Sequence, residues 1–338
     1  MIRYAIGIAV GSVLLAASAS AQEVPLNPAQ SKITAGAALR VRAEPKAAGK
    51  ELARLSMGTV VSATARTPEQ VEIGGRKDYW YRFTLPDGRS GWSFGGLLVD
   101  YNEARRLDIV RGIVSDRMKD LESRMDALMS QEKRDHRPLF GDAVELHRFV
   151  AEAAAATTEA NAKVELELLA LDSFGKALAT IPEDGKEKPP FAEWIASHKA
   201  VAEHVSFNHH FGGYYLMSGA WWELEKKYRG TPLGEKIAWR ATQSPSRAGN
   251  DCEGDKVCEL EDAQAGAGAY LRAYPNGANA GEALAKLHDA VAALAGPEPA
   301  ISAEDKAALR SIVVKTGVQK RDEVLKLIDS LTPLKAAK

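Results

Sequence analysis

Long apolar runs are missing from this chain beyond its first 21 residues. A helix that crosses a bilayer needs about 20 consecutive, mostly apolar residues. Even the run from Ile6 to Ala17 is shorter than that. We therefore predict that the chain has no transmembrane segment.

The first residues have the three parts of a secretory signal peptide. Arg3 provides the positive charge, the run from Ile6 to Ala17 is apolar, and Ala19 and Ala21 flank Ser20 as small residues before a cleavage site. No cysteine stands directly after the apolar run, so a lipid anchor is not expected. We predict a signal peptide over residues 1–21 and a periplasmic or secreted location.

An excess of charge of either sign is also missing, because 44 Lys and Arg face 45 Asp and Glu and the formal net charge is −1. Proteins that bind nucleic acid or anionic membranes carry clustered excess Lys and Arg. The balance favours neither class of partner, and no nucleic-acid partner is predicted.

Cysteine is scarce, with Cys252 and Cys258 alone in 338 residues. In an exported chain, two neighbouring cysteines with Gly254 between them favour a disulfide that closes a small loop. A zinc site would need more Cys or His ligands close by, and a nucleophilic Cys would need a free thiol. The acidic residues of this loop lack the spacing of an EF-hand, so we interpret it as a solvated loop. We predict this disulfide, no metal site and no cofactor.

Short β-type segments separated by turns occupy residues 33–101. Alternation in Tyr79, Tyr81 and Phe83 places every second side chain on one face, as in a half-buried strand. Pro86-Asp87-Gly88 then supplies a tight turn. Such a pattern is typical of a small barrel.

The segments "LRVRAEP", "LSMGTVV" and "YWYRFTLPDGRSGW" resemble bacterial SH3 domains in order and spacing. The resemblance implies a barrel of five or six strands over residues 33–101, preceded by a linker at 22–32. It also implies binding of cell-wall peptides or packing against a neighbouring domain. Where proline-binding SH3 domains carry a proline and a tyrosine, this chain has Phe94 and Leu97, so recognition of proline-rich helices is not expected.

The same resemblance makes Trp80 the foremost candidate for contact with a ligand, because an aromatic residue at this place lines the groove of SH3 domains. Trp80 alternates away from the Tyr79, Tyr81 and Phe83 face, which predicts partial exposure. The full set of ligand-binding candidates is Trp80, Tyr79, Trp92 and Phe94. In the alternative interpretation, Trp80 and Trp92 are structural, since Trp tolerates either setting.

Alanine is abundant and β-branched residues become rarer after residue 100, so residues 102–338 are predicted to be almost entirely α-helical. The fold class is thus a small all-β barrel followed by an all-α region, with a possible internal boundary near residues 181–190. Two connections, around Glu235 and Glu282, look alike and resemble tetratricopeptide-like helix pairs. That resemblance implies a surface for protein partners.

The densest group of aromatic and His residues spans Phe207–Tyr215 and Trp221–Glu223. Helical spacing of Tyr214, Met217 and Trp221 favours a role in the core, with a ligand-binding cleft as the alternative. No HExxH pattern accompanies the histidines, and no catalytic residue is assigned. We therefore expect an envelope binding or scaffold protein rather than an enzyme, whose partner is a cell-wall peptide or an envelope protein. The alternative is a peptidoglycan hydrolase with a site near residues 207–223.

Overall fold

The computed structural model describes residues 23–85, 87–209, 212–246, 252, 254–295 and 301–333. The predicted signal peptide lies outside these residues, as do Pro86, His210 and part of the acidic loop before Cys258. The chain divides after Asn102 into two compact units. Among the described residues, no helix combines the length and apolar character that crossing a membrane requires.

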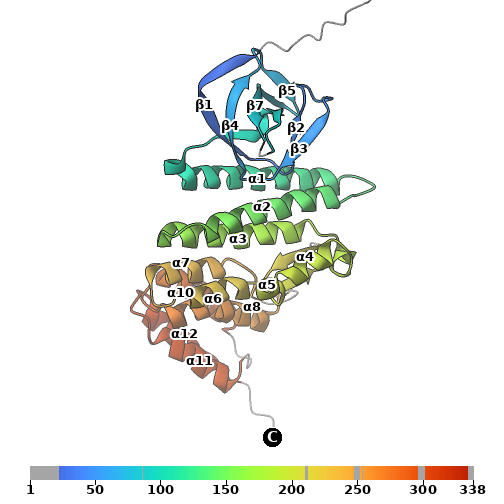
Figure 1. The fold of residues 1–338 in the computed structure, drawn as a ribbon. Coiled ribbons are helices and arrows are strands. Elements are labelled where there is room, and N and C mark those ends of the chain that lie inside the picture. Colours follow the sequence, from blue (N-terminus) through green and yellow to red (C-terminus); the bar gives the residue numbers. More distant parts are fainter. Residues whose placement is uncertain are drawn as a thin grey trace, which may run out of the picture. The chain divides into compact units, whose positions relative to one another are not determined.

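The first unit is a seven-stranded antiparallel sheet in the order β3-β2-β8-β7-β4-β1-β9, which curls into a barrel (Figure 1). A separate two-stranded hairpin, β5–β6, lies between β4 and β7 along the chain. The strands are β1 Val24–Thr34, β2 Leu39–Arg42, β3 Glu51–Leu55, β4 Val60–Arg66, β5 Val71–Ile73, β6 Arg76–Asp78, β7 Trp80–Thr84, β8 Ser90–Phe94 and β9 Leu98–Asp100.

The barrel begins earlier than the sequence predicts. Most of the segment 22–32, predicted as a linker, belongs to β1, which pairs with β4 along its length and with β9 at its end. Its first residues are largely exposed, so they carry no apolar periodicity that would have indicated a strand. Backbone pairing with β4 is what makes them a strand.

Alternation along β7 is confirmed on the inner face, where Phe83 is fully buried. Phe83 packs with Leu39, Val41 and Leu55 in the barrel core. The predicted turn between β7 and β8 is present, with Gly88 at a φ of +84° and Leu85 N donating to Arg89 O over 2.7 Å. Glycine adopts this left-handed backbone without a steric penalty.

Across its described residues, the second unit consists of helices, loops and one hairpin. Helices α1, α2 and α3 lie in succession, side by side (Figure 1). The elements are α1 Arg106–Met129, α2 Arg137–Ala155, α3 Ala160–Ala179, α4 Phe191–Ser197, α5 Lys199–Ala202, β10 Val205–Asn208, β11 Gly213–Leu216, α6 Gly219–Lys226, α7 Pro232–Ala241, α8 Lys256–Ala263, α9 Ala269–Ala273, α10 Ala280–Ala293, α11 Ala303–Val313 and α12 Arg321–Ser330. A π-helical turn, Gln264–Gly268, joins α8 to α9.

Several of these helices are capped at their N-termini by a side chain that accepts hydrogen bonds from backbone N–H groups of the first turn. Glu159 accepts hydrogen bonds from the backbone N–H groups of Asn161 and Ala162 at the start of α3. Thr231 accepts one from Gly234 N at the start of α7. Each cap satisfies donors that the first helical turn leaves without an intrahelical partner.

The hairpin β10–β11 departs from the prediction that the chain after residue 102 is almost entirely α-helical. Tyr214 lies on a strand, paired with Phe207 of β10, and α6 begins only at Gly219. The helical spacing from Tyr214 to Trp221 therefore spans two different elements. Gly212 lies in the turn before β11 and Gly213 is the first residue of β11, and glycines weaken a helix at this place.

Two hydrophobic clusters lie in the described part of the helical unit. One gathers α3, α4, the hairpin, α6 and α7, and it contains Ile181 and Phe191 together. The other gathers α7 to α12 around Tyr270 and Leu287. Residues on both sides of 181–190 share the first cluster, and residues 103–338 form one compact unit.

Candidate functional site

Three of the four aromatic residues predicted to bind a ligand, Trp80, Trp92 and Phe94, form a compact cluster on the outer side of β7 and β8. Trp80 and Phe94 are direct cross-strand partners, with ring centroids 6.0 Å apart in an edge-to-face arrangement. Only 3% of Trp80, 6% of Trp92 and 7% of Phe94 is exposed. The expectation that Trp80 is partly exposed is therefore wrong, and the structural alternative for Trp80 and Trp92 describes their burial.

A short hairpin explains this burial. Ile73, on β5, packs against the cluster of Trp80, Trp92 and Phe94. Arg76, on β6, donates a hydrogen bond to Gly96 O over 2.8 Å and so ties the hairpin to the turn after β8. The β5–β6 hairpin covers the face of β7 that strand alternation directs away from the barrel core.

Tyr79 is the one candidate of the four that remains half-exposed. The Arg66 guanidinium lies over its ring, 3.9 Å from the centroid, and Tyr81 meets the ring edge-on at 6.4 Å. Arg66 also donates from Nη1 to Thr67 O over 3.2 Å. The stacked pair of Tyr79 and Arg66 is called the Tyr79–Arg66 surface below.

The chemistry of this surface suits an acceptor with negative charge. Among the residues that the structure describes, no carboxylate forms an ion pair with Arg66, whereas Arg54 pairs with Glu51 and Arg82 with Glu23. A guanidinium has five N–H donors in a planar fork, and a stacked guanidinium is held in one orientation. Arg66 can therefore present donors to a carboxylate while the Tyr79 ring offers an apolar contact.

In the helical unit, the predicted aromatic and His group lies around the hairpin β10–β11. Phe207 contacts both Tyr214 and His209, with centroids 4.8 and 4.9 Å apart. Tyr214 is buried and donates from its hydroxyl to Glu183 O over 2.6 Å. Burial raises the pKa of the Tyr214 phenol, which keeps the hydroxyl a donor. Tyr214 is thus a core residue whose polar end faces a neighbouring turn; His210 and Phe211 lie outside the described residues.

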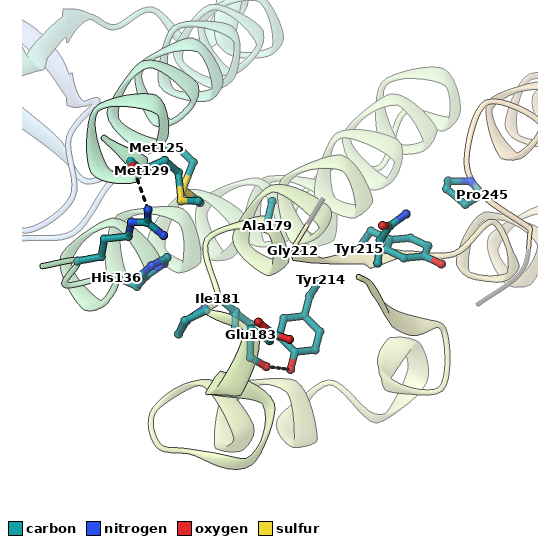
Figure 2. Close-up of a pocket in the computed structure, with 14 residues that line it drawn as sticks. Met125, Met129, His136, Ala179, Ile181, Glu183, Gly212, Tyr214, Tyr215 and Pro245 are labelled. Carbon is teal, nitrogen blue, oxygen red and sulfur yellow. Dashed lines mark hydrogen bonds between the residues drawn. The ribbon is translucent and has the colours of Figure 1, made fainter. Parts of the chain in front are cut away.

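A cavity of about 620 Å³ opens beside this hairpin and is called the hairpin pocket (Figure 2). Met125 and Met129 come from α1, and His136 from the segment after it. Tyr214 and Tyr215 come from β11. Figure 2 shows the methionines and His136 at one end and Tyr215 with Pro245 at the other. The pocket is assembled from segments that are up to 120 residues apart in the sequence.

The two basic groups of the hairpin pocket, Arg134 and His136, stand at the methionine end. Arg134 donates from Nη2 to Met129 O over 3.0 Å. His136 Nδ1 lies 2.8 Å from Thr180 O, and a carbonyl only accepts, so Nδ1 carries the proton. Nε2 of His136 is then the ring nitrogen available to a ligand. Sequence reasoning missed Arg134, Met125 and Met129 as site residues, because nothing in the local sequence indicates that they line one pocket with Tyr214 and Tyr215.

The remaining members of the predicted group lie elsewhere. Trp221 is buried on α6, and the Arg240 guanidinium lies 4.7 Å from its ring centroid. Glu223 is exposed and pairs with Lys226 over 2.5 Å. Neither residue lines the hairpin pocket. The structure therefore does not bring Glu223 into one site with the pocket.

Cys252 and Cys258 are joined, with Cα atoms 5.4 Å apart, as the sequence predicts. Asp255, in the loop that they close, caps α8 by accepting from the backbone N–H groups of Val257 and Cys258. That loop acid therefore has a structural role. Across the described part of the chain, no cluster of three or more His, Cys, Asp or Glu side chains is arranged to hold a metal ion.

Comparison with known proteins bears on the first unit. A search of curated proteins and a search of solved structures each found no match to the chain. The family model described as the bacterial SH3 domain matches residues 37–99, which run from just before β2 into β9. The match confirms the resemblance that the sequence motifs indicated. The chain contains a bacterial SH3 domain followed by a helical unit.

Proposed function

We propose that this protein is an exported, non-catalytic binding protein of the cell envelope whose SH3 domain engages peptidoglycan peptides. The single observation that carries the proposal is the match of residues 37–99 to the bacterial SH3 domain, a binding module for cell walls or for proteins. The helical unit serves as a second interaction surface.

The Tyr79–Arg66 surface is the proposed contact with the peptide. Peptidoglycan stem peptides carry free carboxylates, which the planar fork of a guanidinium binds through two parallel hydrogen bonds. Arg66 is stacked 3.9 Å from the Tyr79 ring centroid and has no ion-pair partner among the described residues. Trp80 supports this surface from within the fold and does not touch the peptide.

Export is part of the proposal. The pattern from Arg3 to Ala21 has the features of a secretory signal, and the Cys252–Cys258 disulfide is compatible with an oxidising compartment. Expression of the full chain followed by mass measurement of the protein from the periplasmic or secreted fraction tests it. We expect a mature chain that starts after Ala21. Full-length protein found only in the cytoplasm would contradict export.

Co-sedimentation of the purified protein with peptidoglycan sacculi tests the binding role. We expect the protein to pellet, and Arg66→Gln and Tyr79→Ala each to reduce the pelleted fraction at least about fivefold. Arg54→Gln is the matched control, because Arg54 is exposed and paired with Glu51 on another part of the same domain. If the wild-type protein stays in solution, or if both site variants pellet as well as it does, the proposed contact is wrong and the SH3 domain docks to a protein instead.

The same incubations test the non-catalytic role. We expect no soluble muropeptides in the supernatant after prolonged incubation of the protein with sacculi. Release that disappears in His209→Ala or Glu223→Ala would support a peptidoglycan hydrolase and overturn the binding-only role.

A further inference from the structure

The hairpin pocket has the size and the mixed lining of a small-molecule site. Ligand pockets in proteins typically measure about 300 to 1,000 Å³ and combine a mostly apolar wall with a few polar groups that fix orientation. The cavity here measures about 620 Å³. Its wall is mostly apolar, with side chains such as Met125, Ile181 and Tyr214. The volume is sufficient for one molecule of a few fused or linked rings.

The methionine end provides an adaptable apolar contact. Met129 is 45% exposed although it is a large apolar side chain, and Met125 lines the pocket beside it (Figure 2). Methionine side chains are flexible and polarisable, and they make favourable contacts with aromatic rings. A bound apolar group would remove the exposed Met129 thioether from water.

The same end carries two basic groups, and neither forms an ion pair with a carboxylate of the described residues. The Asp184 carboxylate, which pairs with Lys188, also attracts His136 from a greater distance. Arg134 donates to Met129 O, and no carboxylate forms an ion pair with it. His136 is anchored through Nδ1 to Thr180 O, which leaves Nε2 for a ligand. A guanidinium held by one backbone carbonyl keeps further N–H donors for an anion. The exposed Glu183 carboxylate is the acid of the pocket, and its backbone oxygen receives the Tyr214 hydroxyl.

From this arrangement we infer that the hairpin pocket binds a small organic anion with an apolar body, whose charged group is held by Arg134 and whose body lies between Met125, Met129 and Tyr214. The site is in the helical unit and is independent of the peptide contact proposed for the SH3 domain. It gives the helical unit a ligand of its own.

Two fluorescent probes of the same shape separate the charge from the apolar body. Anilinonaphthalene sulfonate carries an anionic group, and phenylnaphthylamine has the same ring system without it. We expect the purified full-length protein to bind both probes, with Arg134→Gln weakening the anionic probe at least about tenfold and leaving the neutral probe within about twofold. Arg137→Gln is the matched control, because Arg137 is exposed, lies three residues away and does not line the pocket.

A second variant tests the location. Ala179 is exposed at the last position of α3 and lines the pocket, so Ala179→Phe fills the cavity without changing a buried side chain. We expect it to abolish binding of both probes while circular dichroism stays unchanged. Ala292→Phe, at an exposed position near the end of α10, should bind both probes like the wild type.

Competition identifies the apolar body. Displacement of the anionic probe by dodecanoate indicates an alkyl body, and displacement by phenylbutyrate indicates an aromatic one. The inference is overturned if neither carboxylate competes, if Arg134→Gln binds the anionic probe as tightly as the wild type, or if Ala179→Phe leaves probe binding intact. Each of these outcomes leaves the sedimentation of the protein with sacculi unaffected, so the two proposals fail separately.

Discussion

Tyr274 donates a hydrogen bond of 2.7 Å to Glu225, although the two residues are 49 positions apart in the sequence. Glu225 is fully buried on α6, and Arg229 pairs with the same carboxylate over 2.7 Å. Burial and the hydrogen bond to Glu225 raise the pKa of Tyr274 to about 12, so the phenol remains a donor. This bond links α6 to the end of α9. A buried carboxylate is costly without hydrogen-bond or ion-pair partners, so Glu225 depends on Tyr274 and Arg229.

Removal of the Tyr274 hydroxyl should therefore destabilise the protein. In Tyr274→Phe, the buried Glu225 carboxylate keeps Arg229 but loses its neutral donor, which we expect to lower the free energy of unfolding by about 1–3 kcal/mol. Urea denaturation followed by far-ultraviolet circular dichroism measures this change. Tyr228→Phe is the comparison, since Tyr228 donates to Glu167, which is partly exposed and can be hydrated. Equal losses in the two variants would contradict the importance of burial.

His147 should make the helical unit less stable in acid. Burial lowers the pKa of His147 to about 4, and its Nδ1 donates to Ala170 O over 3.0 Å. The usual histidine value is about 6.5, so protons bind the unfolded chain more tightly than the folded one. The stability that neutral His147 contributes is fully present above about pH 6.5 and is lost as the pH falls towards about 4.

The measurement is the free energy of unfolding across that pH range. His147→Phe keeps an aromatic ring against Phe174 and removes the titrating group, so its stability should fall less steeply between pH 6.5 and 4. His288→Gln, at a partly exposed position on α10, should follow the wild-type curve. Parallel curves for the wild type and His147→Phe would show that His147 is not the titrating group.

Trp80 and Tyr79 are adjacent, yet their substitution should have different effects. Trp80→Ala removes a side chain that is 97% buried beside Phe94, so we expect a loss of about 3–5 kcal/mol in the stability of the SH3 domain. Tyr79→Ala removes a half-exposed ring and should cost much less. Thermal melts followed by near-ultraviolet circular dichroism distinguish the two. If Trp80→Ala is as stable as the wild type but no longer binds sacculi, Trp80 contacts the ligand and its role is not purely structural.

The Cys252–Cys258 disulfide closes a loop of seven residues. A crosslink across a loop of that length lowers the conformational entropy of the unfolded chain. The folded state is thereby stabilised by about 2 kcal/mol. We expect reductant to lower the denaturation midpoint of the wild type, and the double variant Cys252→Ser, Cys258→Ser to have the lowered midpoint with or without reductant. A wild-type midpoint that reductant leaves unchanged would mean that the loop contributes nothing to global stability.

Local pattern was sufficient for much of the fold. The rise in alanine after residue 100 predicted a helical region, and α1, α2 and α3 each bury one face there. Periodicity failed at Tyr214, where a helical spacing arose by coincidence across a strand and the helix after it. Strands as short as β10 and β11 contain too few residues for alternation to be recognised in the sequence, so their pairing is known only from the structure.

By itself, the sequence determined the two-part organisation, the SH3 character of residues 37–99 and the pairing of Cys252 with Cys258, since these depend on composition, motif order and neighbours along the chain. Only the tertiary structure decided which aromatic residues reach the surface. Trp80 alternates outward and is nevertheless buried, because the β5–β6 hairpin folds over it. The stacking of Arg66 on Tyr79 and the approach of Arg134 to the hairpin pocket likewise depend on contacts that no local pattern encodes.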